Sequence, residues 1–191
     1  MWPSGKGGHR RPVNCVAIVG ALECTIMATP LIEVLRAASG SRSAQVYVSG
    51  ALTCVDAQRA ASLRAFYSAI GGIFRAESFR AYVPHENGTD PTTDPEAMPQ
   101  EVYRADMAQV AASVLVIAYV GEPSLGVGAE IEHARAEGVP VVLLHEHGRR
   151  VSRLILGCPA VIACMAIMDL EDGVAQLRTI VKETPQCRHT A

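Results

Sequence analysis

The sequence has few aromatic residues and no long apolar run, and each absence narrows the class of protein. Phenylalanine, tryptophan and tyrosine together make up 5% of the 191 residues, although 49% of all residues are hydrophobic. A core of this composition consists mainly of Val, Ile, Leu and Ala, which is typical of buried parallel strands. No stretch reaches the roughly 20 apolar residues that cross a bilayer, so we expect no membrane association.

The chain also lacks a strong charge of either sign. Its formal net charge is −2, and acidic and basic residues are interspersed beyond residue 43. Without a basic stripe to neutralise a phosphate backbone, a nucleic-acid polymer is not an expected ligand. A small anionic molecule is compatible, because a single phosphate needs only a few local donors.

Patterns typical of metal sites are missing as well. The six cysteines form no C-x-x-C pair, and neither they nor the six histidines have the spacing of a zinc site. We therefore expect no metal and no cofactor. The cysteines are interpreted as small buried hydrophobic residues of a reducing compartment, which predicts a cytoplasmic protein.

The first 43 residues do not follow the pattern of the rest. Three basic residues precede the apolar run Val13–Leu22, which loosely resembles a secretory signal, although an acidic residue follows at once. Two other interpretations stay open: an extra strand and helix (Cys15–Val19, then Thr29–Ala38) or a disordered extension. We expect residues 1–43 to be an N-terminal extension and residues 44–191 to form the catalytic domain.

From residue 44, short apolar runs alternate with segments of helical periodicity. This alternation is typical of right-handed βαβ units. It predicts an α/β fold with a doubly wound, roughly five-stranded parallel sheet and helices on both faces, a Rossmann-like arrangement. The predicted strands are Val46–Gly50, Phe79–Val83, Val114–Val120, Val141–Leu144 and Val161–Met168, and the predicted helices are 57–70, one beginning at Pro99, one ending near Glu137, 150–156 and Asp172–Val181.

Two details of the helices are predicted from local patterns. Gly71 and Gly72 are expected to end the helix that begins at residue 57. The helix after Pro99 is expected to pack through residues at i, i+4, i+7 and i+8, namely Tyr103, Met107, Val110 and Ala111. Between them, His85–Met98 is predicted to be a long loop.

The chemistry is expected at the carboxyl ends of the strands, where open parallel sheets bind ligands. In the segment Gly121–Glu130, Ser124 suits a helix N-cap, while Gly126 and Gly128 keep side chains away from an approaching ligand. The helix dipole favours an anion there and is expected to help keep Glu130 ionised. An ionised, positioned carboxylate is what attack at an anomeric carbon requires.

Spacing alone does not select this carboxylate. A glycine-rich helix start followed by glutamate is often only a structural cap. Glu101, Glu122 and Glu132 are rival carboxylates, and an isolated aspartate such as Asp106 is commonly a solvated helix residue. Residue types and spacing therefore leave these alternatives open.

The octapeptide Pro123–Glu130, PSLGVGAE, resembles the nucleoside 2-deoxyribosyltransferase family. It is most similar to the branch of 5′-monophosphate N-glycosidases, which includes deoxynucleotide N-hydrolases and CMP hydrolases. The resemblance extends over about residues 45–170 and includes Val46–Gly50 and Glu101–Asp106. It implies hydrolysis of the N-glycosidic bond of a nucleoside 5′-monophosphate to free base and sugar phosphate, through a covalent glycosyl intermediate.

The resemblance also implies roles for individual residues. Glu130 matches the family's nucleophile, and Asp106 matches the acidic residue that assists the departing base or orients the sugar. Tyr47 matches an aromatic residue near the nucleophile. Ser152 matches a phosphate-contacting serine donated by the neighbouring subunit, which implies a homodimer with shared sites. Ser124, Gly126 and Gly128 match the family's nucleotide-contacting loop, and Gly50, Ala51 and Leu52 are expected to bind substrate because they follow the carboxyl end of the first strand.

One departure from the family pattern concerns the phosphate. The N-hydrolase branch often carries serine directly after the first-strand glycine and arginine two positions later, whereas Ala51 and Thr53 stand here. Arg149, Arg150 and Arg153 are the candidate replacements for that arginine.

Two alternatives to hydrolysis remain. One is a transferase, in which a second base replaces water; the other is a non-catalytic nucleotide sensor, against which the presence of both Glu130 and Asp106 argues. The sequence favours no particular base and neither ribose nor deoxyribose.

Overall fold

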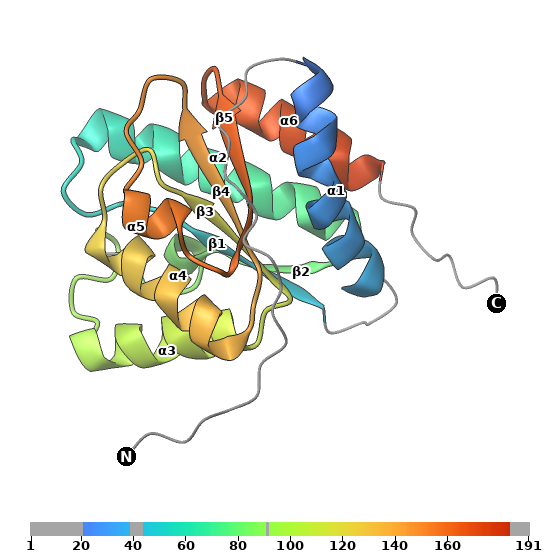
Figure 1. Cartoon of the computed structure of the whole chain (residues 1–191). Coiled ribbons are helices and arrows are strands. Elements are labelled where there is room, and N and C mark those ends of the chain that lie inside the picture. Colours follow the sequence, from blue (N-terminus) through green and yellow to red (C-terminus); the bar gives the residue numbers. More distant parts are fainter. Residues whose placement is uncertain (1–20, 39–43, 91, 184–191) are drawn as a thin grey trace.

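Five parallel strands form a single sheet with the order β2-β1-β3-β4-β5 (Figure 1). The computed structural model describes residues 21–38, 44–90 and 92–183. This arrangement confirms the predicted α/β fold with a five-stranded parallel sheet. The strands are β1 (Gln45–Ser49), β2 (Arg80–Tyr82), β3 (Leu115–Tyr119), β4 (Val141–Glu146) and β5 (Val161–Ile167).

Helices cover both faces of the sheet (Figure 1). One face carries α1 (Ala21–Ala38), α2 (Ala57–Ala76) and α6 (Leu170–Lys182); the other carries α3 (Pro99–Ala111), α4 (Leu125–Glu137) and the short α5 (Arg153–Leu156). Because both faces are covered, every residue of β1 and β3 is buried. None of the helices in the described ranges has the length and apolar character needed to cross a membrane.

The strand order places a topological switch between β1 and β3. The chain first moves from β1 outward to β2 through α2, then returns past β1 to β3 through α3 on the opposite face. Ligands of open α/β sheets bind at the carboxyl edge of such a switch. The candidate residues of β1, α3 and α4 are therefore gathered where ligands of this fold class bind.

The first element of the described residues is the helix α1. It includes the predicted helix Thr29–Ala38 and begins earlier, at Ala21. Leu31 and Leu35 are buried in the same hydrophobic cluster as α2 and α6. The other predicted element, the strand Cys15–Val19, lies outside the described residues. The boundary at residue 43 stays a prediction.

The expected end of α2 at Gly71 and Gly72 is wrong, because the helix continues to Ala76. Ile73 and Phe74 are buried and extend the apolar face by another turn. Gly71 lies against Val83, where an added Cβ would come within 2.8 Å of Val83 Cγ2. Close packing of the helix against Val83, the residue after β2, explains this glycine better than termination does.

The expected packing face of α3 is also partly wrong. Val110 is buried, but the Tyr103 side chain is 65% exposed and Ala111 is exposed too. The face toward the sheet instead follows Val102, Asp106 and Val110 at four-residue spacing. The helix is thus turned so that a carboxylate rather than an aromatic ring points inward.

The cysteines are less buried than expected. Within the described residues, Cys54 is exposed and Cys158 and Cys164 are partly exposed, and all three are free thiols. The interpretation of cysteine as a buried residue is therefore wrong for Cys54.

Candidate active site

Glu130 is held by two hydroxyl groups from β1. Tyr47 Oη donates a hydrogen bond to Glu130 Oε1 at 3.0 Å, and Ser49 Oγ donates to Glu130 Oε2. Alternate residues of a strand share a face, so Tyr47 and Ser49 both point toward α4. Both side chains are fully buried. Both carboxylate oxygens of Glu130 are therefore fixed in position.

Asp106 forms the other half of the site. It is only 8% exposed on the inner face of α3. Thr89 Oγ1 of the long loop donates to Asp106 Oδ1 at 3.5 Å, and the Tyr82 hydroxyl of β2 donates to the same carboxyl group. The negative charge of Asp106 raises the pKa of Glu130, so the two carboxyl groups interact electrostatically.

Two stacked tyrosine rings join these halves. Tyr47 and Tyr82 are register partners on the adjacent strands β1 and β2, so their side chains lie side by side. Their ring centroids are 5.6 Å apart with an interplanar angle of 14°. A continuous polar and aromatic wall therefore runs from Glu130 through the two rings to Asp106.

Both carboxyl groups bind protons more tightly than an ordinary carboxylate does. Burial raises the pKa of Glu130 to about 7, with a smaller upward contribution from Asp106, while the Ser49 and Tyr47 hydrogen bonds act in the opposite direction. Burial likewise raises the pKa of Asp106 to about 6. The expectation that the helix dipole helps keep Glu130 ionised stays a prediction; Glu130 is the sixth residue of α4, whereas the dipole acts mainly on the first turn, and burial raises the pKa.

The start of α4 has the expected open geometry. Ser124 is the N-cap, and its Oγ accepts a hydrogen bond from the Val127 backbone N–H at 3.3 Å. A Cβ added at Gly128 would meet nothing within 4 Å, and one at Gly126 would meet only the Ser124 Oγ at 3.7 Å. The backbone here is therefore accessible to a ligand.

The segment after β1 is more tightly packed. A Cβ at Gly50 would come within 2.1 Å of the Tyr67 ring, so this glycine is needed for packing. Ala51 is buried, and its carbonyl accepts a hydrogen bond from Tyr67 Oη at 3.2 Å, while Leu52 is half-buried. Gly50, Ala51 and Leu52 therefore offer a ligand no charged side chain.

The rival carboxylates are exposed or form ion pairs with arginine residues. Glu101 is exposed, and Glu132 is an exposed partner of Arg135. Glu122 forms ion pairs with Arg59 at 2.9 Å and with Arg149 at 3.2 Å. Within the described ranges, no group of three His, Cys, Asp or Glu side chains is arranged to hold a metal ion.

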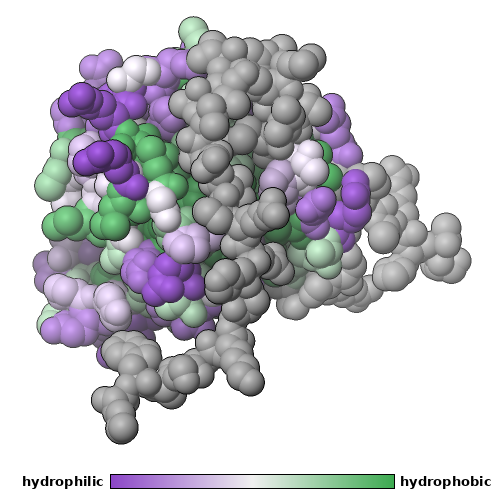
Figure 2. Space-filling model, in the orientation of Figure 1, coloured by the Kyte–Doolittle hydropathy of each residue, from purple (hydrophilic) through white to green (hydrophobic). Residues whose placement is uncertain are grey.

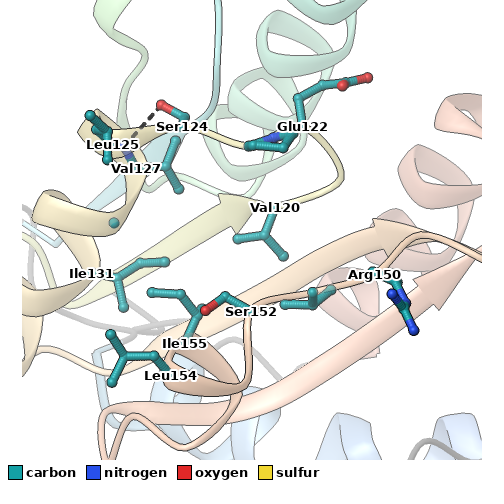
Figure 3. A pocket seen from close by; sticks show the side chains of 13 residues that line it. Val120, Glu122, Ser124, Leu125, Val127, Ile131, Arg150, Ser152, Leu154 and Ile155 are labelled. Carbon is teal, nitrogen blue, oxygen red and sulfur yellow. Dashed lines mark hydrogen bonds between the residues drawn. The ribbon is translucent and has the colours of Figure 1, made fainter.

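Ser152 is not part of the cluster around Glu130. It is exposed at the N-cap of α5, and its side chain makes no capping hydrogen bond. It lines a separate groove of about 740 Å³, on whose other side lie Ser124 and Leu125 (Figure 3). Arg150 lines the same groove, whereas Glu130, Tyr47 and Asp106 do not.

Sequence reasoning missed three residues of the site: Ser49, Tyr82 and Thr89. Ser49 was detectable in principle, because it lies two residues after Tyr47 on the same face of a predicted strand. Tyr82 required knowledge that its strand pairs with β1 in this register. Thr89 lies in a loop, where no periodicity indicates the direction of a side chain.

Comparison with known proteins identifies relatives by sequence, although no family model matches the chain. One relative from Methanosarcina mazei is 39% identical over 67 residues, covering 35% of this chain and 42% of the relative. Another, from Methanococcoides burtonii, is 39% identical over 57 residues, covering 30% and 47%. Both are provisionally named 2′-deoxynucleoside 5′-phosphate N-hydrolase 1. Over these segments the chain is similar in sequence to both relatives.

The matches span less than half the length of these two N-hydrolases. The similarity in sequence confirms the predicted resemblance.

Two solved structures share the fold of the chain. The CMP N-glycosidase BcmB of Clostridium botulinum has a TM-score of 0.54 at 17% identity, covering 71% of this chain and 98% of that protein. The protein BlsM has a TM-score of 0.57 at 19% identity, covering 76% and 93%.

Proposed function

We propose that the chain hydrolyses the N-glycosidic bond of a nucleoside 5′-monophosphate, with Glu130 as the nucleophile. The observation that carries the proposal is the pair of hydrogen bonds from Tyr47 and Ser49 that fixes the Glu130 carboxylate, whose pKa the charge of Asp106 also raises. The names of the sequence relatives support the reaction and the class of substrate. We further propose that the protein acts in the cytoplasm, which the free thiols of Cys54, Cys158 and Cys164 among the described residues support.

In the first step, an oxygen of ionised Glu130 attacks C1′ of the sugar and the bond from C1′ to the base nitrogen breaks. The electron pair of that bond leaves with the base, which Asp106 assists by donating a proton or a hydrogen bond. A carboxyl group with a pKa of about 6 carries a proton for part of the time near neutral pH. The two buried hydroxyl donors hold the nucleophile in one orientation.

In the second step, water attacks C1′ and releases Glu130, which gives the free sugar phosphate. Ionised Asp106 is placed to accept the proton of that water, by the reverse of its first role. The Tyr47 and Ser49 hydroxyl groups again stabilise the departing Glu130 carboxylate. The balance of the reaction is nucleotide plus water to base plus sugar phosphate, with no redox change.

The proposal includes a homodimer with shared sites, because Ser152 lies apart from Glu130 within one chain. The groove beside Ser152 is bordered by Leu125 and Leu154, whose side chains are 96% and 84% exposed. In Figure 2, hydrophobic surface lies over the area where α5 and the start of α4 are seen in Figure 1. Such a surface supports contact with a second copy, which would bring its Ser152 to the phosphate.

The proposal is tested by Glu130→Gln, assayed by chromatographic detection of free base from a panel of nucleoside monophosphates. Turnover is expected to fall by at least about 1,000-fold, since the nucleophile is removed. Glu132→Gln is the matched control, because Glu132 is an exposed glutamate of the same helix. If Glu130→Gln retains activity within about tenfold of wild type, a barrier change of only about 1.4 kcal/mol, the assignment is wrong.

The same assay separates hydrolysis from base exchange. Adding a second free base in excess is expected to leave sugar phosphate as the main product. Accumulation of a new nucleotide carrying the added base would instead identify a transferase.

A further inference from the structure

Ser49 gives Glu130 a contact whose consequence for the choice of sugar goes beyond holding the carboxylate in position. Its hydroxyl donates to Glu130 Oε2, while Tyr47 occupies Oε1. Within the described residues, Glu130 is the only hydrogen-bond acceptor of this hydroxyl, and the Ser49 side chain is fully buried. Both oxygens of the nucleophile are therefore engaged by the protein before a sugar arrives.

The position of Ser49 along β1 brings it toward the substrate. It is the last residue of the strand, two positions closer than Tyr47 to the carboxyl edge where ligands bind. The Tyr47 ring is held deeper in the fold by its stack on Tyr82. Ser49 is thus the hydroxyl group of the pair that lies nearer the sugar.

The chemistry of the sugar makes this contact informative. When one carboxylate oxygen bonds C1′, the other oxygen faces the neighbouring C2′. In a ribose, a 2′-hydroxyl can donate to that oxygen, and such hydrogen bonds strengthen in the transition state. A 2′-deoxyribose has no group that can do so, and the protein must supply the donor itself.

We propose that the Ser49 hydroxyl takes the place that a ribose 2′-hydroxyl would occupy against Glu130, so that Ser49 is the residue that makes the site selective for 2′-deoxyribosyl substrates. A ribose 2′-hydroxyl would have to compete with Ser49 for the same oxygen. The inference rests on the proposed function, because it assigns the sugar at the same catalytic centre.

The experiment compares kcat/KM for ribo- and 2′-deoxyribonucleoside 5′-monophosphates that carry the same base. Wild type is expected to prefer the deoxy substrate by at least about tenfold, the usual worth of one hydrogen bond to a charged group. Ser49→Ala should lose about 10- to 100-fold on the deoxy substrate but less than about threefold on the ribo substrate, whose 2′-hydroxyl replaces the missing donor. The deoxy-to-ribo ratio should therefore fall by at least about tenfold.

Two further variants control the comparison. Ser49→Thr keeps a hydroxyl group and is expected to keep the deoxy preference. Ser62→Ala removes an exposed α2 hydroxyl that bonds only the Gln58 carbonyl, and it should change neither rate.

Equal losses of Ser49→Ala on both sugars would overturn the inference while leaving the proposed hydrolysis intact. Equal wild-type rates on the two sugars would do the same, and this measurement does not depend on the folding of any variant. Release of no base from either substrate would overturn both the inference and the proposed function.

Discussion

At the scale of single residues, the burial of Glu130 has opposite effects on chemistry and on stability. Burial shields the proposed nucleophile from bulk water, and it also raises the pKa of the carboxyl group from 4.5 to about 7. A carboxyl group that binds its proton more tightly in the folded state favours unfolding once it ionises. The free energy of unfolding should therefore decrease as pH rises from about 4.5 to 7, over the range in which Glu130 ionises.

The first prediction follows from this decrease in stability with rising pH. Glu130→Gln removes the ionisation and should raise Tm relative to wild type at pH 8, by on the order of 5 °C, with little difference at pH 4. Thermal unfolding of both proteins across this pH range measures the effect. In parallel, kcat/KM of wild type should fall as pH drops below about 7. A Tm difference that is the same at both pH values would contradict the buried-charge explanation.

The second prediction concerns Asp106. Because a poor leaving base needs a proton or a hydrogen bond to depart, Asp106→Asn should slow substrates with poor leaving groups most. Rates for a series of nucleotides with bases of graded leaving ability give the measurement. Glu101→Gln, an exposed glutamate of the same helix, is the control. Equal losses across the series would show that Asp106 orients the sugar instead.

At the scale of elements, α2 offers two adjacent glycines in contrasting surroundings. Gly72 is exposed, and a Cβ there would meet nothing within 4 Å, whereas one at Gly71 would come within 2.8 Å of Val83. Gly72→Ala should stabilise the protein by about 0.5–1 kcal/mol, because alanine loses less backbone entropy in a helix. Gly71→Ala should destabilise it. Chemical denaturation of the two variants measures both, and stabilisation by both would refute the packing role of Gly71.

The loop between β2 and α3 is fixed to α2 by an ion pair. Asp90 is 2% exposed and accepts hydrogen bonds from Arg64 Nε and Nη2 at 2.6 and 2.8 Å. The neighbouring Thr89 donates to Asp106, so this ion pair also positions a donor of the active site. The Arg64 guanidinium holds the pKa of Asp90 well below its ordinary range.

Asp90→Asn should lower the free energy of unfolding by about 1–3 kcal/mol and reduce turnover, because it removes a charged partner of Arg64. Denaturation and base-release assays measure the two effects, with Glu96→Gln, an exposed loop residue, as control. Since the folded pKa is lowered, the contribution of wild-type Asp90 should disappear as pH falls below its ordinary value of about 3.8. An Asp90→Asn protein of wild-type stability at pH 7 would contradict this role.

The sequence predicted the elements better than the contacts between them. Apolar runs located all five strands, because strands buried on both faces are nearly continuously apolar. The packing face of α3 was misjudged, because periodicity assigns hydrophobic residues to the core and cannot foresee a buried Asp106. The Tyr47–Tyr82 stack depends on strand order and register, which local patterns do not contain.

At the scale of the whole molecule, the proposed dimer gives the last prediction. Leu125→Asp and Leu154→Asp place charges in the exposed apolar groove and should yield monomers of low activity, measured by sedimentation and base release. Met168→Asp is the control, because Met168 is 71% exposed but does not line the groove.

A mixing experiment examines the shared site directly. Ser152→Ala and Glu130→Ala chains, each impaired alone, should recover activity on monophosphates when mixed, because one site per mixed dimer is intact. Wild type that sediments only as a monomer at assay concentration would rule out the shared site.

The groups that contact Glu130 and Asp106 all come from one continuous part of the chain, between Tyr47 and Glu130. The strands and helices that follow, from β4 to α6, supply Ser152 and one side of its groove. The proposed bond-breaking groups thus precede Ser152 in the sequence, while the groove beside Ser152 combines residues from both stretches. If the proposed roles hold, substitutions at Ser152 and its neighbours in α5 can change assembly or phosphate preference and leave Tyr47, Ser49, Asp106 and Glu130 unchanged.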